Sequence, residues 1–75
     1  MIIEELQFKI FENVEALKSF IEKNFNVVAM QERDNTEFEI DDEIDFMTDE
    51  WDYSVYYMKG NSGRIIVVET GAQGY

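Results

Sequence analysis

Apolar and polar positions change their period several times along this chain of 75 residues, and each period predicts a different element. Over residues 1–11, Leu6, Phe8 and Ile10 alternate with other residues, and period two over this length predicts a half-buried strand. A helix is the alternative for this segment, because its first half contains two glutamates and a leucine, which are good helix formers.

Residues 13–25 carry the clearest helical pattern. Val14, Leu17 and Ile21 recur at helical spacing and form one apolar face. Asn13 is a suitable N-cap, because its side-chain oxygen can accept a free backbone N–H of the first turn. We therefore expect an amphipathic helix over this range.

Two hairpins are predicted beyond the helix. Residues 27–31 are β-branched and apolar, and residues 37–41 alternate between apolar and acidic, with a polar turn between the two stretches. Residues 53–59 and 64–70 form the second pair of strand patterns, and the stretch Gly60-Asn61-Ser62-Gly63 between them is a turn signal. Residues 65–68 are apolar on both faces, which indicates a central strand with the helix on one side.

Residues 42–52 have a different pattern. Ile40, Ile44, Met47 and Trp51 fall at spacings of four, three and four, which is a helical stripe. Asp and Thr are mediocre helix formers, and like charges four residues apart oppose a helix. A short acidic helix and an ordered acidic loop therefore both remain open.

These elements predict an α+β fold, with one amphipathic helix packed on an antiparallel sheet of four to five strands. The length corresponds to a single small domain over residues 1–75, since domains usually have about 50 residues or more. The glycine-containing residues 71–75 are expected to be a frayed tail.

The negative charge is concentrated in one segment. Residues 32–52 hold eleven acids and one base, a net charge of −10 out of −11 for the whole chain. The other residues carry six acids and five bases and are close to neutral. Apolar side chains such as Phe38, Ile44 and Phe46 lie within the segment, so it has residues with which to fold. This segment is the candidate functional surface.

Composition excludes several classes of function. Cysteine and histidine are absent, and no serine or threonine has a basic partner at a recognisable spacing, so we predict a protein that is not an enzyme and needs no cofactor. A net charge of −11 repels nucleic-acid phosphates and anionic membranes, which favours a basic protein partner. No export signal or membrane-spanning run is visible, so a cytoplasmic location is expected.

The carboxylates of residues 41–52 fall at the ligand spacing of an EF-hand calcium loop. The loop needs a glycine at its sharp turn, where this chain has Phe46, and its last ligand is the shorter Asp52 instead of glutamate. Divalent-cation binding by this stretch is therefore a third hypothesis, behind two hypotheses of protein binding.

The density of acids suggests imitation of the DNA backbone. Duplex DNA carries one negative charge per about 1.7 Å of axis. A strand face made of Glu37, Glu39 and Asp41 offers one charge only every ~6.6 Å. Were residues 42–52 helical, six acids would lie within about 16 Å, or one per about 2.7 Å. The hypothesis therefore depends on residues 42–52 being ordered beside the strand.

In size and charge, the chain resembles the small acidic inhibitors that phages and mobile elements encode, among them anti-restriction, anti-CRISPR and DNA-glycosylase inhibitor proteins. The resemblance is one of composition, and it implies a DNA-mimic inhibitor that occupies the basic nucleic-acid-binding groove of an enzyme in a bacterial host. The alternative is a small interaction or regulatory domain, antitoxin-like, immunity-like or homo-oligomeric, that binds a basic protein of another kind. The residues predicted to contact the partner are Glu37, Glu39, Asp41, Asp42, Glu43, Asp45, Asp49, Glu50 and Asp52.

Overall fold

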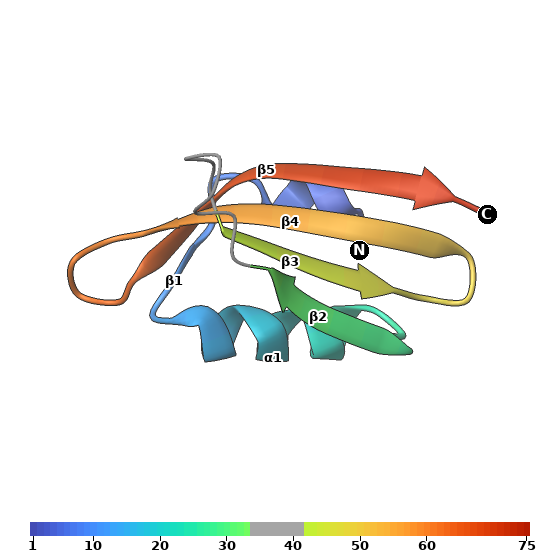
Figure 1. Cartoon of the computed structure of the whole chain (residues 1–75), viewed down its shortest axis with the longest axis horizontal. Helices are drawn as coiled ribbons and strands as arrows, with labels where there is room; N and C mark the ends of the chain where they lie inside the picture. The colour runs from blue at the N-terminus through green and yellow to red at the C-terminus, as the bar shows by residue number, and fades with distance from the viewer. Residues whose placement is uncertain (34–41) are drawn as a thin grey trace.

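One α-helix packs against a five-stranded antiparallel sheet in the computed structural model, which describes residues 1–33 and 42–75 (Figure 1). This arrangement confirms the predicted α+β fold. In chain order the elements are the 3-10 helix η1 (Ile3–Leu6), β1 (Ile10–Phe11), α1 (Val14–Asn24), β2 (Ala29–Arg33), β3 (Asp42–Met47), β4 (Trp51–Lys59) and β5 (Ile65–Gly74).

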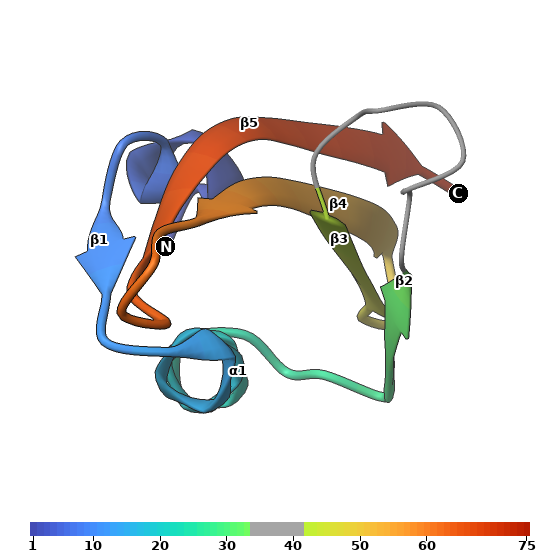
Figure 2. The ribbon, with the colours of Figure 1, turned by 60° about the vertical axis from the view of Figure 1, so that its left-hand side comes forward.

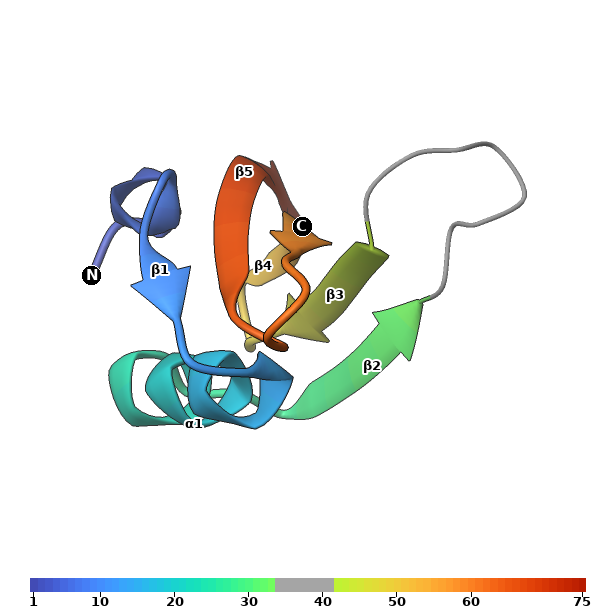
Figure 3. The same ribbon diagram turned by 90° about the vertical axis from the view of Figure 1, so that its left-hand side faces the viewer.

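The strands lie in the order β1-β5-β4-β3-β2, and every neighbouring pair is antiparallel. β1 and β2 precede and follow α1 in sequence but form the two edges of the sheet, so the helix must cross beneath it. Figure 2 shows the sheet curving over α1, and Figure 3 shows β1 and β2 at opposite edges of the sheet. One helix therefore covers one face of the sheet.

The predicted helix over residues 13–25 is confirmed as α1. The side-chain oxygen of Asn13 accepts a hydrogen bond from the backbone N–H of Ala16 at 2.8 Å, as expected of an N-cap. Leu17 and Ile21 are fully buried and point at the sheet. The helix ends at Asn24, and Phe25 then adopts an extended backbone conformation.

Ten buried apolar side chains form a single core between the helices and the sheet. Within the described ranges 1–33 and 42–75, no polar or charged residue is buried. Alternate residues of the three central strands supply most of the core, because successive side chains of a strand point to opposite faces. The buried residues are Ile3, Leu6, Leu17, Ile21, Ile44, Phe46, Val55, Tyr57, Ile65 and Val67.

The strand predicted over residues 1–11 is wrong for most of its length. Ile3 and Leu6 are both buried on one side of η1, as the period of about three residues per turn in a 3-10 helix allows. Phe8 then has a φ of 68°, a left-handed conformation that interrupts an extended chain. Only Ile10–Phe11 pairs with β5 as a strand.

Residues 42–52 form neither a helix nor an irregular loop. They comprise β3, a tight turn and the start of β4. Ile44 and Phe46 are both buried and pair in register with Val55 and Tyr53, so the period of two prevails over the helical stripe. β2 pairs with β3, and the strand predicted over residues 37–41 lies outside the described residues.

Residues 71–75 are not a frayed tail, because β5 continues to Gly74. Gly74 pairs with Trp51, whose ring lies so close that a methyl group on Gly74 would stand 3.3 Å from Cζ3 of the indole. The backbone N–H of Tyr75 donates to the carbonyl oxygen of Glu50 at 3.1 Å. Glycine has low strand propensity, and the aromatic ring opposite compensates for its missing side chain.

The turn predicted between residues 60 and 63 is confirmed. The N–H of Gly60 donates to the carbonyl of Arg64 at 2.7 Å, and the N–H of Gly63 donates to that of Gly60 at 3.2 Å. Gly63 has a φ of 88°, which is unfavourable for any residue with a side chain.

We expect Gly63→Ala to lower the free energy of unfolding by about 1 kcal/mol, because alanine at positive φ is strained. The space around Gly63 is open, so the cost is conformational and not steric. Gly60→Ala is the matched control, since a methyl group there would make only an ordinary contact of 3.5 Å with the Arg64 carbonyl. Chemical denaturation of both variants measures the difference, and equal stabilities would contradict the turn geometry.

Candidate functional site

Six of the nine acids predicted to contact a partner lie in the described residues, all on the β3–β4 hairpin. The alternation of the strands divides them among different sides of the molecule. Glu37, Glu39 and Asp41 lie outside the described residues. The six described acids are Asp42, Glu43, Asp45, Asp49, Glu50 and Asp52.

Three of these acids share the face of the sheet that points away from α1. Ile44 and Phe46 of β3 are buried in the core, so Glu43 and Asp45 point to the opposite face. Asp52 of β4 pairs in register with Met47 of β3 and lies on this same face. We call this surface, on the side of the sheet away from α1, the open face.

The other acids lie off the open face. Asp42 is on the core side of β3, at the beginning of the strand, and is half-buried. Asp49 and Glu50 are exposed in the turn. Thr48 organises this turn, because its hydroxyl accepts from the N–H of Glu50 at 3.4 Å and from that of Trp51 at 3.3 Å. The two turn carboxylates are thus held at the tip of a well-formed hairpin.

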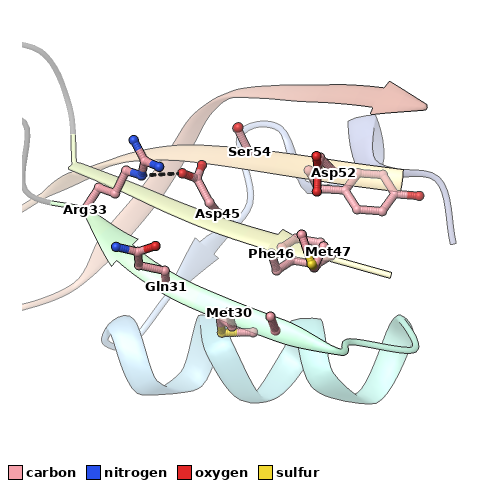
Figure 4. A pocket seen from close by; sticks show the side chains of 10 residues that line it. Met30, Gln31, Arg33, Asp45, Phe46, Met47, Asp52 and Ser54 are labelled. Atoms are coloured by element: carbon pink, nitrogen blue, oxygen red, sulfur yellow. Dashed lines mark ion pairs between the residues drawn. The ribbon is translucent and has the colours of Figure 1, made fainter. Parts of the chain in front are cut away.

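An ion pair on the open face offsets one of the negative charges. Nε of Arg33 lies 2.6 Å from Oδ2 of Asp45, across the β2–β3 pair (Figure 4). The two side chains line a hollow of about 420 Å³ together with Ser54 and Asp52. The other oxygen of Asp45, Oδ1, is buried with no hydrogen-bond partner among the described residues. The ion pair between Arg33 and Asp45 therefore links β2 to β3 and reduces the negative charge that the open face offers to a partner.

A second hollow, of about 400 Å³, lies between the end of α1 and the tip of the hairpin. Its walls combine aromatic rings with the two turn carboxylates. Trp51 is 42% exposed there, and its ring is stacked 6.3 Å from that of Tyr53, measured between centroids. We call this surface the acid–aromatic end and define it by Phe25, Asp49, Glu50, Trp51 and Tyr53.

Trp51 belongs to the apolar stripe over residues 40–51, and such a stripe predicts a buried side chain, but Trp51 is exposed in the structure. The indole ring lies at the rim of the sheet, above Gly74, and leaves much of its surface open. The rings of Phe25, Phe46 and Tyr53 pack behind it, with centroids 4.9 to 5.3 Å apart. In the sequence, Trp51 stands between two acids, Glu50 and Asp52, and acidic neighbours on both sides are unusual for a core tryptophan.

The EF-hand spacing does not produce a calcium loop in the part of the chain that the structure describes. Residues 42–47 are extended and paired on both sides, whereas the loop must wrap around its ion. Over residues 1–33 and 42–75, no group of three or more acids converges to hold a metal ion. Asp41, the first position of the spacing, lies outside these ranges.

Comparisons with protein-family models, with curated proteins and with solved structures give no match to this chain. No helix of the described residues is long and apolar enough to cross a membrane. The geometry of the hairpin is therefore the basis on which its function is inferred.

Asp52 also holds the C-terminal residue in place. The hydroxyl of Tyr75 donates a hydrogen bond to Oδ1 of Asp52 at 2.6 Å. This hydrogen bond, with a smaller contribution from the negative charge of Asp52, raises the pKa of the Tyr75 phenol above its usual value of 10.0.

We expect Asp52→Asn to lower the pKa of Tyr75, as measured by ultraviolet absorbance during alkaline titration. Because the pKa is raised in the folded state, the contribution of this contact to stability is fully present below the usual tyrosine pKa. It is lost as the pH rises through the raised pKa. Tyr75→Phe assigns the signal, and an unchanged titration in Asp52→Asn would show that the contact does not form.

Proposed function

We propose that this protein is a non-enzymatic binding protein whose acid–aromatic end receives a lysine or arginine side chain of a basic partner protein. The observation that supports the proposal is the hollow in which Asp49 and Glu50 stand beside the exposed ring of Trp51. Carboxylates and aromatic faces are the two kinds of group that attract an organic cation.

The local chemistry favours arginine as the inserted residue. A guanidinium group is planar and can stack on Trp51 while its N–H groups donate to the carboxylates of Asp49 or Glu50. A cation over an aromatic ring contributes about 0.5–2 kcal/mol, depending on how far it is desolvated. The turn that carries both acids is ordered by Thr48, so little entropy is lost when they are engaged.

The net charge of the whole protein affects the rate at which a basic partner associates with it. A net charge of −11 attracts a basic surface over a Debye length of about 8 Å at physiological salt. Such attraction mainly increases the association rate and depends on ionic strength. The partner's affinity should then be set by the hollow, and its on-rate by the wider acidic surface.

Imitation of duplex DNA is the second candidate, favoured by the net charge of −10 within residues 32–52. The helix on which its charge density depended is absent. In the observed strand and turn, the six described acids are spread over about 25 Å, or one charge per ~4 Å. This charge density is well below that of duplex DNA, which carries one charge per about 1.7 Å. We therefore favour a basic protein surface over a nucleic-acid-binding groove as the site to which this protein binds.

We expect the double variant Asp49→Asn and Glu50→Gln to weaken partner binding by about 100-fold, since it removes the two carboxylates that line the hollow. The partner is first isolated from an extract of the native host and then purified for calorimetry. The matched control, Glu4→Gln and Glu5→Gln, changes the net charge equally at exposed positions elsewhere. An equal loss in both variants would mean that total charge matters and the hollow does not.

Competition separates the two candidate functions. If the partner uses the same groove for nucleic acid, added duplex DNA should displace this protein from the complex in proportion to its concentration. For a partner whose basic surface is not a nucleic-acid site, we expect the complex to persist in DNA at matched ionic strength. Displacement by DNA but not by an equally charged polyglutamate would favour the mimic.

A further inference from the structure

We infer that the segment of the basic partner that carries the inserted arginine binds as an additional strand along the outer edge of β5, at Ala72 and Gly74. The inference rests on the function proposed above, because it specifies how the residue that enters the acid–aromatic end is held. Strand β5 has ten residues, but its outer neighbour β1 has only two. Figure 1 shows β5 continuing well past β1 toward the C-terminal end of the sheet.

The outer edge of β5 is paired only along its first part, as far as residues 1–33 and 42–75 are concerned. β1 pairs with the first two residues of β5, and the N–H of Phe8 then donates to the carbonyl of Val67 at 2.7 Å. The side-chain amide of Gln7 donates to the hydroxyl of Thr70 at 3.2 Å. Beyond Thr70, β5 has no strand partner on this side among the described elements.

The hydrogen bonds between β5 and β4 identify the groups of β5 that remain free. The N–H of Tyr75 donates to the carbonyl of Glu50, and Gly74 pairs in register with Trp51. In an antiparallel pair, residues that exchange hydrogen bonds alternate with residues that do not. Tyr75 therefore uses its backbone groups toward β4, and Gly74 and Ala72 direct theirs outward. Within the described part of the chain, no backbone–backbone hydrogen bond uses these outward N–H and C=O groups.

The side chains at this edge do not obstruct a further strand. Residues 70–74 carry no charge, and the last three of them are exposed. Edge strands that resist the addition of another strand usually carry charged side chains or proline. β2, at the opposite edge of the sheet, fits that description, because Glu32 and Arg33 are exposed in it. The free part of β5 is therefore the edge at which strand addition is favoured.

The position of Trp51 determines which residue the added strand carries. Trp51 lies on the α1 side of β4, as buried Val55 does, and Cζ3 of its ring would stand 3.3 Å from a methyl group on Gly74. The ring therefore extends over β5 toward its free edge. A side chain of the added strand opposite Gly74, on the same side of the sheet, meets this ring. Asp49 and Glu50 line the same hollow as Trp51, so an arginine at this position can stack on the indole and donate to a carboxylate.

Charge favours a basic partner over a second copy at this edge. Pairing of β5 with β5 of a second copy would bring together two proteins that each carry a net charge of −11. The contact would also lie beside the turn that holds Asp49 and Glu50, so the acids of the two copies would approach each other. A strand that carries arginine brings the opposite charge to the same place.

Two N-methylated peptides test this arrangement on the full chain. The probe is the blocked peptide Thr-Val-Arg-Val-Thr, whose arginine pairs with Gly74 in an antiparallel ladder and donates its N–H to the Gly74 carbonyl. N-methylation of the arginine removes this donor, so the affinity measured by the fluorescence of Trp51, the single tryptophan, should fall about tenfold. N-methylation of the following valine, whose N–H points away from β5, is the matched control and should leave the affinity unchanged.

Amide hydrogen exchange measured by NMR locates the bound peptide. The N–H groups of Ala72 and Gly74 should exchange quickly in the free protein and become protected by about tenfold or more at saturating peptide. The N–H of Gln73, which the alternation directs to β4, should change little and is the internal control. Ala72→Pro removes one outward donor and no hydrogen bond to β4, so it should weaken binding of the peptide and leave thermal unfolding unchanged.

The outcomes distinguish the failure of strand addition from the failure of the proposed function. Equal affinities of the two methylated peptides, or binding at Trp51 without protection of Ala72 and Gly74, overturn strand addition and leave the proposed function standing. A fluorescence of Trp51 that responds neither to the peptide nor to argininamide contradicts the proposed function, and strand addition with it. Protection of the two amides in the free protein also overturns the inference, because the edge is then occupied by the chain itself. Where that protection rises with protein concentration, a second copy is the occupant.

Discussion

The packing of one helix against one face of the sheet is the contact on which the rest of this structure depends. Leu17 and Ile21 are fully buried, and they meet a sheet whose inward positions include Ile44 and Val55, a cross-strand pair. Each fully buried leucine or isoleucine contributes about 1.5–3 kcal/mol relative to an exposed one. A chain of this length buries only about 60% of the surface of its unfolded chain, less than a larger domain does, so it has little stability to lose.

This one-sided burial also determines where the charges go. Once Ile44 and Phe46 are directed to the core, Glu43 and Asp45 must point to the opposite face, since strand side chains alternate. Glu43, Asp45 and Asp52 therefore lie on the side of the sheet that α1 leaves uncovered. Asp49 and Glu50 lie in the turn, and Asp42 lies at the beginning of β3 on the core side. A helix over the same residues would have gathered all of them on one side.

Local signals predicted the parts of the fold that depend on near neighbours. The helix was identified from its N-cap and its apolar spacing, and the β4–β5 hairpin from its glycine turn. The prediction for residues 42–52 was wrong because Ile44 fits both a helical stripe and a strand, and the choice depends on its pairing with Val55 of the neighbouring strand. The prediction for the last residues was wrong because their glycines have low strand propensity of their own, and their order depends on pairing with β4, where the ring of Trp51 lies against Gly74.

Asp49 and Glu50, which line the acid–aromatic end, are two of the nine acids predicted from the sequence to contact a partner, but the sequence did not predict their arrangement. Charge can be counted along the chain, whereas the hollow at the acid–aromatic end needs the end of α1 and the β3–β4 turn to meet. Phe25 and Glu50 are far apart in sequence, and no local pattern connects them.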